Sequence, residues 1–204
     1  MGKYESAHSI APDDAEVLLN WACTLVEMAQ RTEDDESEDL FHRAEAKYGE
    51  AHDRRPTEPL ILVGWGTDLF LRSRKRGVDT GNLLEEAQRK YNRALVIAPD
   101  DPDTLNGLGV VMMARTSMMI GTACQKLLAQ AEAALKRSAE LRPWPALYNL
   151  ALLYAKEGDE GRCREALEGC RRQGFLPSKD ELLREEDLRS VRDHAWFQAL
   201  LQVP

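Results

Sequence analysis

The sequence predicts an all-α fold built from repeated pairs of antiparallel helices, and three observations support this. First, large, large, small and large residues recur at positions i, i+3, i+4 and i+7, which form one face of a helix. Second, a pattern such as Ala44, Tyr48 and Ala51 follows each of the first three copies. Third, prolines at 12, 56, 99 and 143 recur every 43 or 44 residues. Self-similarity of this kind is typical of a solenoid of helix pairs.

The first pattern occurs four times, and its third slot holds a small residue that lets the two helices of a pair approach closely. Its copies are Leu18, Trp21, Ala22 and Leu25; Leu62, Trp65, Gly66 and Leu69; Leu105, Leu108, Gly109 and Met112; and Leu147, Leu150, Ala151 and Tyr154. The second pattern continues as Ala87, Tyr91, Ala94 and Pro99, and as Ala131, Leu135, Ser138 and Pro143. Each closing proline is expected to end the second helix, because proline cannot supply the helical N–H.

These slots resemble those of the tetratricopeptide repeat family over roughly residues 2–173. In that family the first helix carries a large, a leucine, a small and an aromatic residue, and the second carries alanine, an aromatic and alanine before a proline. The resemblance implies a right-handed superhelix with a concave groove. It is specific for fold and uninformative about the partner, since a fold hosts many functions.

The repeat is longer here than the family's period of about 34 residues. The leading leucine of the first helix precedes the first small residue of the second by 26, 25 and 26 residues in three repeats, and by 16 in the fourth. The inserted residues have helix-forming composition, so we expect both helices of each pair to be longer. The turns within the pairs are then predicted near 32–38, 77–82, 119–123 and 157–160.

The chain divides into three predicted parts. Residues 1–14 match only a second helix, through Tyr4, Ala7 and Pro12, which fits either a fragment of a longer array or a shortened cap. Residues 15–173 hold four helix pairs. Residues 174–204 are expected to form capping helices over the last pair. Their apolar residues are Leu182, Leu183, Leu188, Val191, Trp196, Phe197, Leu200 and Leu201.

Composition agrees with a cytoplasmic helical protein. Of the 204 residues, 30% are charged and 43% hydrophobic, with no apolar run of about 18 residues and no signal peptide. We therefore predict no membrane span. The net charge of −8 argues against a nucleic-acid backbone as the partner.

No catalytic, cofactor-binding or metal site can be assembled from the sequence. Cys23, Cys124, Cys163 and Cys170 show no Cys-x-x-Cys spacing, and we interpret them as small buried thiols in a reducing compartment. The four histidines are scattered over polar faces. We predict that the chain is not an enzyme and needs no cofactor.

Two charged runs fall at equivalent places in successive repeats: the acidic run 33–39 and the basic run 72–76. Equivalent turns of a solenoid share one edge, so the runs either neutralise each other or leave the basic run free for an anion. Mutual neutralisation is favoured because it requires no partner.

One side of the first helices is more apolar than a solvated face should be. In this family that side lines the concave groove, so we predict a partner-binding groove with Tyr148 and Met113 as anchors. Either a partner segment, the chain's own terminal helix or a second copy covers it. The predicted groove residues are Leu19, Cys23, Val63, Thr67, Leu71, Asn106, Val110, Met113, Tyr148 and Leu152.

The predicted function is non-enzymatic binding of a peptide or amphipathic helix from another protein. Family members that hold the acidic tails of heat-shock chaperones use cations on the concave face. The corresponding slots here include Leu19, Cys23, Gly64 and Asp103, so that function is not expected. The alternative is a structural scaffold that self-associates through the ends of its solenoid.

Overall fold

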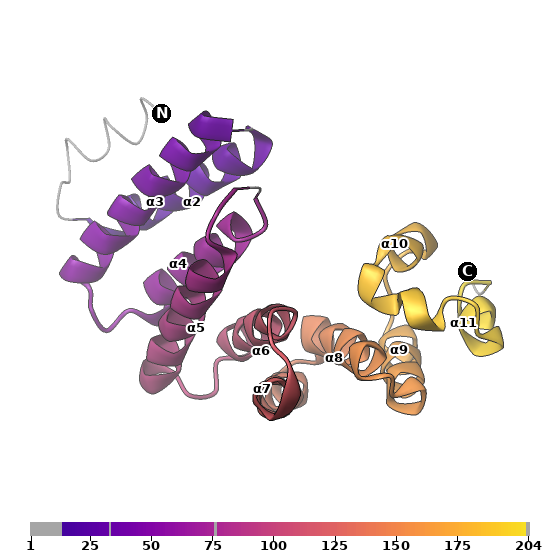
Figure 1. Cartoon of the computed structure of the whole chain (residues 1–204). Coiled ribbons are helices and arrows are strands. Elements are labelled where there is room, and N and C mark those ends of the chain that lie inside the picture. The colour runs from indigo at the N-terminus through magenta and orange to yellow at the C-terminus, as the bar shows by residue number, and fades with distance from the viewer. Residues whose placement is uncertain (1–13, 33, 76, 203–204) are drawn as a thin grey trace.

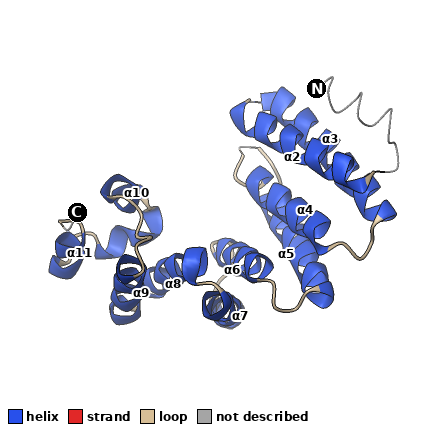
Figure 2. Ribbon diagram, turned by 180° about the vertical axis from the view of Figure 1, so that it is seen from behind, coloured by secondary structure: helices blue, strands red, loops and turns tan. Residues whose placement is uncertain are grey.

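The computed structural model describes residues 14–32, 34–75 and 77–202, and every regular element within them is helical. Figures 1 and 2 show the pairs following one another along an elongated array, from both sides. The predicted all-α solenoid is confirmed. The helices are α2 (Ala15–Arg31), α3 (Asp34–Arg54), α4 (Pro59–Arg72), α5 (Thr80–Ile97), α6 (Pro102–Thr116), α7 (Gly121–Leu141), α8 (Pro143–Glu157), α9 (Glu160–Arg172), α10 (Lys179–Arg184), the 3₁₀ helix η1 (Glu186–Val191) and α11 (Ala195–Leu200).

The predicted partial repeat over residues 1–14, with Tyr4, Ala7 and Pro12, lies outside the described residues except for Asp14. It therefore stays a prediction, as does the idea that the chain self-associates through its ends. The division into four repeats and a cap likewise stays an interpretation of the helices seen.

Helix starts follow from local chemistry. The side chains of Asp14, Asp79, Asp101 and Asp159 each accept a hydrogen bond from a backbone N–H in the first turn of the helix that follows. Such capping satisfies donors that have no partner within the helix. Prolines occupy the first position of α4, α6 and α8, where no N–H is needed.

The sequence suggested that both helices of each long repeat are extended. In the structure, the extra residues are not shared equally between the two helices. The second helices α3, α5 and α7 span 21, 18 and 21 residues, whereas α9 spans 13. The first helices α4, α6 and α8 span only 14, 15 and 15. The extension therefore projects mainly from the second helices and from the turn 73–79.

The acidic run is also placed differently from the prediction of a turn over 32–38. α2 ends at Arg31 and α3 begins at Asp34, so most of the run forms the first turns of α3. Carboxylates are favourable there, because the N-terminal end of a helix carries partial positive charge.

The small residues of the first helices act as predicted. A Cβ at Gly66 would lie 3.2 Å from the Tyr91 ring, and one at Gly109 would lie 2.5 Å from Cγ of Leu135. These rings and methyl groups belong to the second helix of the same pair. Glycine at both sites therefore sets how closely the two helices pack.

The contact between the first two pairs differs from the contacts that follow. The buried side chains of α2 and α3, with Ile61, form one apolar cluster, and those from α4 onward form another. Trp65 packs against both and stacks on Tyr48 with ring centroids 6.3 Å apart. Polar groups, among them the buried Arg72 and Asp68, make up part of this seam between α3 and α4.

The charged runs do meet, as the favoured interpretation held, but through particular residues. Arg72 pairs with Glu38 and lies 3.5 Å from Glu45, both on α3. Lys75 donates from Nζ to the backbone oxygens of Ala29 at 3.0 Å and Thr32 at 2.9 Å. A cation at these last carbonyls of α2 complements the negative end of the helix.

We expect Lys75→Met to lower the free energy of unfolding by about 0.5–1.5 kcal/mol, because two backbone acceptors lose a charged donor. Arg74→Met is the matched control, since Arg74 is exposed and makes no described side-chain contact. Urea unfolding at low and high salt measures both. Equal effects of the two substitutions would show that Lys75 does not cap α2.

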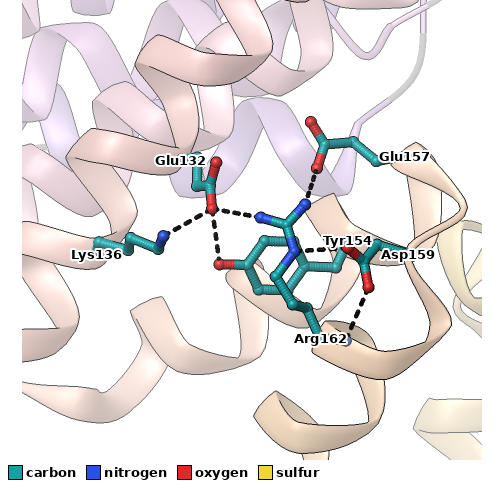
Figure 3. A network of polar contacts seen from close by, with 6 residues as sticks. All are labelled: Glu132, Lys136, Tyr154, Glu157, Asp159 and Arg162. Carbon is teal, nitrogen blue, oxygen red and sulfur yellow. Dashed lines mark hydrogen bonds and ion pairs between the residues drawn. The ribbon is translucent and has the colours of Figure 1, made fainter.

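A network of hydrogen bonds and ion pairs connects α7, α8 and α9 (Figure 3). Glu132 accepts from Lys136 at 2.8 Å, from the Tyr154 hydroxyl at 3.0 Å and from Arg162 at 2.7 Å. The hydrogen bond from Lys136 is the main cause that lowers the pKa of Glu132. The guanidinium of Arg162 also lies 4.3 Å from the centre of the Tyr154 ring. Because each charge has a partner, we interpret this network as structural.

Candidate functional site

The candidate site is the surface formed by the first helices of the pairs. α2 contacts α4, α4 contacts α6, and α6 contacts α8, so these helices form one continuous wall. The second helices pack behind them, in contact with the first helix of the next pair. We call the surface that the ten predicted residues would form on these first helices the inner groove; its role in binding stays a prediction.

Contacts between first helices of neighbouring repeats involve two of the predicted groove residues. Cδ1 of Leu19 on α2 lies 3.5 Å from where a Cβ of Gly64 on α4 would be. On the next helices, the Asn149 amide of α8 donates to Oδ1 of Asn106 on α6 at 2.7 Å.

Two tyrosines of the second helices reach through to the inner groove. The Tyr48 hydroxyl lies 3.6 Å from Sγ of Cys23, and the Tyr91 hydroxyl lies 2.9 Å from Oγ1 of Thr67. Space for the Tyr91 ring exists only because Gly107 lacks a Cβ, which would lie 2.7 Å from it. Burial raises the pKa of both phenols, so each remains a neutral hydroxyl.

The same two slots are apolar in the second half of the array. By repeat register, Val110 and Leu135 replace the Thr67 and Tyr91 pair in the third repeat. Leu152 takes the corresponding slot of the first helix in the fourth. At these slots the lining therefore changes from hydroxyl groups on α4 and α5 to apolar side chains on α6, α7 and α8.

The ten predicted residues differ in how much surface they offer. Cys23 and Thr67 are exposed, and six are half-buried: Leu19, Val63, Leu71, Asn106, Val110 and Tyr148. Met113 and Leu152, in contrast, are only 6% and 8% exposed. The expectation that Met113 is an anchor was wrong in this respect, because α6 packs against its neighbours and Met113 joins the apolar core.

The C-terminal end packs against the helix that carries Leu152. η1 contacts α8, and Leu152 belongs to the same large apolar cluster as Leu188 and Val191. Ser190 also approaches the backbone oxygen of Ala155 at 3.5 Å. We infer that the C-terminal segment covers the last turns of α8 and leaves the rest of the inner groove open.

None of the ten groove side chains carries a charge. Asp103, an acidic side chain that sequence register placed beside the groove, pairs with Arg142. At the far end, burial and the Glu185 carboxylate raise the pKa of Tyr148, which keeps its hydroxyl neutral. The inner groove is thus suited to apolar and hydrogen-bonding contacts rather than to charge pairing.

Comparison with known proteins supports the fold. No family model matches the chain, and no curated protein matches it. Among solved structures, PilW, described as a widely conserved type IV pilus biogenesis factor, matches with a TM-score of 0.69 at 19% identity, over 98% of this chain and 80% of that chain. The chain has a tetratricopeptide repeat fold. YrrB, described as a TPR protein with an unusual peptide-binding site, matches over 98% of both chains at 16% identity, with a lower TM-score of 0.42.

Within this tetratricopeptide repeat fold, sequence reasoning missed three residues that shape the inner groove. Tyr48 and Tyr91 were assigned only to the repeat core. Trp144 was not considered, yet it is 41% exposed, and its ring lies 6.0 Å from Tyr148 and 5.5 Å from Phe175. Its place at the start of α8, one turn before Tyr148, is the signal that could have identified it.

The cysteines fit their expected structural role only in part. Cys163 and Cys170 are buried in α9, and burial raises the pKa of their thiols to about 12 and about 11. Cys23 is exposed in the inner groove, contrary to the expectation that all four are buried, and Cys124 is half-buried.

Among the described helices, none combines the length and the apolar character that crossing a bilayer requires.

Proposed function

We propose that this chain is a protein-interaction module whose inner groove binds an uncharged, apolar or amphipathic segment of another protein. The observation that carries the proposal is the lining: ten side chains without a charge, in a chain of which 30% of residues are charged. Eight of them are half-buried or exposed, which leaves apolar surface for contact. An amphipathic helix in a groove is a common mode of recognition.

The polar groups of the inner groove define what the bound segment offers. One amide N–H of Asn149 donates to the amide oxygen of Asn106. Their other amide groups have no described partner, and they suit main-chain N–H and C=O groups of a ligand. Trp144 and Tyr148 provide a rigid aromatic contact at the end of the inner groove, of the kind that contributes strongly to binding.

The test begins with peptides of about 15 residues selected from a random displayed library against the wild-type chain. Val63→Glu/Val110→Glu should weaken the selected peptides at least about tenfold in fluorescence anisotropy, since burying a carboxylate in an apolar contact costs more than about 1.4 kcal/mol. Val96→Glu/Leu141→Glu is the matched control. It adds the same charges at exposed positions of the second helices α5 and α7.

Circular dichroism of both double variants checks that they remain folded. The proposal predicts apolar selected peptides that the control variant binds like the wild type. Selected peptides that are rich in charge and bind the groove variant undiminished would contradict it.

A further inference from the structure

A separate cavity lies at the C-terminal end of the array, between the end of α9, the start of α10 and the end of α11. Its volume is about 370 Å³, within the usual range for a small-ligand pocket. Four leucines contribute its apolar surface: Leu176, Leu182, Leu200 and Leu201. None of the ten groove residues lines it, so it is independent of the function proposed above.

Two cations complete the lining of this cavity. Arg171 lies in the last turn of α9, Lys179 is the first residue of α10, and both are exposed. Within the part of the chain that the structure describes, no carboxylate pairs with either one.

Two nearby carboxylates are engaged by other groups. Glu168 accepts from Arg164 at 2.8 Å, and the charge of Arg171 contributes less than this hydrogen bond to lowering the pKa of Glu168. Glu181 closes a capping box, in which it accepts from the Ser178 backbone N–H at 2.8 Å and from the Ser178 hydroxyl at 2.6 Å. Among the described residues, no carboxylate forms an ion pair with Arg171 or Lys179, so both cations can contact an added anion.

We propose that this cavity binds an anionic amphiphile, an apolar chain that ends in a single carboxylate. The leucines favour an apolar body, because transfer of apolar surface from water to the cavity is favourable. The planar fork of Arg171 matches the two oxygens of a carboxylate, and Lys179 adds a second positive charge. A fatty acid and the apolar C-terminus of a polypeptide both have this chemistry.

Isothermal titration calorimetry with four probes tests the charge requirement and separates the two sources. The probes are octanoate, octanamide, acetyl-Leu-Leu with a free carboxylate, and the C-terminal amide of that dipeptide. Each carboxylate is expected to bind at least about tenfold more tightly than its amide, as a charge-assisted hydrogen bond implies. The tighter of the two carboxylates identifies the source that the cavity prefers.

The variant Arg171→Gln/Lys179→Gln should lose at least about tenfold in affinity for the carboxylates and little for the amides. Arg55→Gln/Lys126→Gln removes two exposed cations elsewhere and should bind all probes like the wild type. All four positions are exposed, and circular dichroism confirms folding. Absence of carboxylate binding, equal binding of acid and amide, or undiminished binding by the first variant would overturn the proposal.

Discussion

Gly109→Ala is expected to lower the free energy of unfolding by about 1–2 kcal/mol, although alanine normally stabilises a helix. The added methyl would meet Cγ of Leu135 at 2.5 Å and the Ala131 backbone oxygen at 3.3 Å. Leu135 is fully buried, so it has no free space to move into. The two helices of the third pair must therefore separate, which costs more than the gain in helix propensity.

Gly49→Ala is the matched control, because it also lies inside a helix but has no atom within 4 Å of an added Cβ. It should raise the free energy of unfolding by about 0.5–1 kcal/mol through helix propensity alone. Urea unfolding of both variants measures the contrast. A stabilising effect at both positions would show that α6 and α7 are not as closely packed as described.

The second large effect concerns the buried carboxyl of Asp68, at the seam between α3 and α4. Asp68 is only 2% exposed, and its Oδ1 has no hydrogen-bond partner among the described residues. Burial raises its pKa to about 8, against the opposing effect of Arg72 and with the help of Glu45 and Glu38. His42, a further titratable group at this seam, contacts Arg72 at 3.1 Å.

The pKa of Asp68 is higher in the folded chain than in the unfolded chain, where the carboxyl ionises near pH 4. The free energy of unfolding therefore falls as the pH rises from about 4 to about 8. Each unit of pKa difference corresponds to about 1.4 kcal/mol. Asp68→Asn cannot ionise, so its stability relative to wild type should increase by a few kcal/mol across this window. The measurement is urea unfolding at several pH values between 4 and 8.

The exposed Asp193→Asn provides the control for loss of one negative charge, and its stability relative to wild type is measured over the same window. A constant difference for Asp68→Asn would mean that Asp68 is ionised and solvated in the folded chain.

Most of the fold could be predicted from the sequence, because the repeated spacing of large and small residues is a local pattern. The spacing of Gly109 from its neighbours on one helix face correctly predicted that the two helices of its pair approach closely, and the structure places Leu135 at that contact. The acidic run was misplaced for a local reason: carboxylates suit both a turn and the first turn of a helix. The start of α3 at Asp34 decides between these possibilities.

The candidate site was less predictable, because it depends on contacts between distant segments. Helical periodicity places Met113 and Leu152 on the groove side, but it does not report that packing between repeats and by η1 covers them. Tyr48 and Tyr91 were recognised as core residues, whereas their hydroxyls reach groove residues of the first helices. The burial of Asp68 has no sequence signal, since its slot holds Thr24 in the first repeat and Val111 in the third.

The most direct test of the inner groove is the rate at which a thiol reagent labels Cys23, with and without a saturating selected peptide. Cys23 is exposed on the inner groove, whereas Cys124 lies near the start of α7, where its thiol contacts the Thr116 backbone oxygen at 3.8 Å. Peptide mapping by mass spectrometry reads each cysteine separately. If the segment binds in the inner groove, it should slow the labelling of Cys23 and leave the rate at Cys124 unchanged. An unchanged rate at Cys23 under saturating peptide would contradict the account.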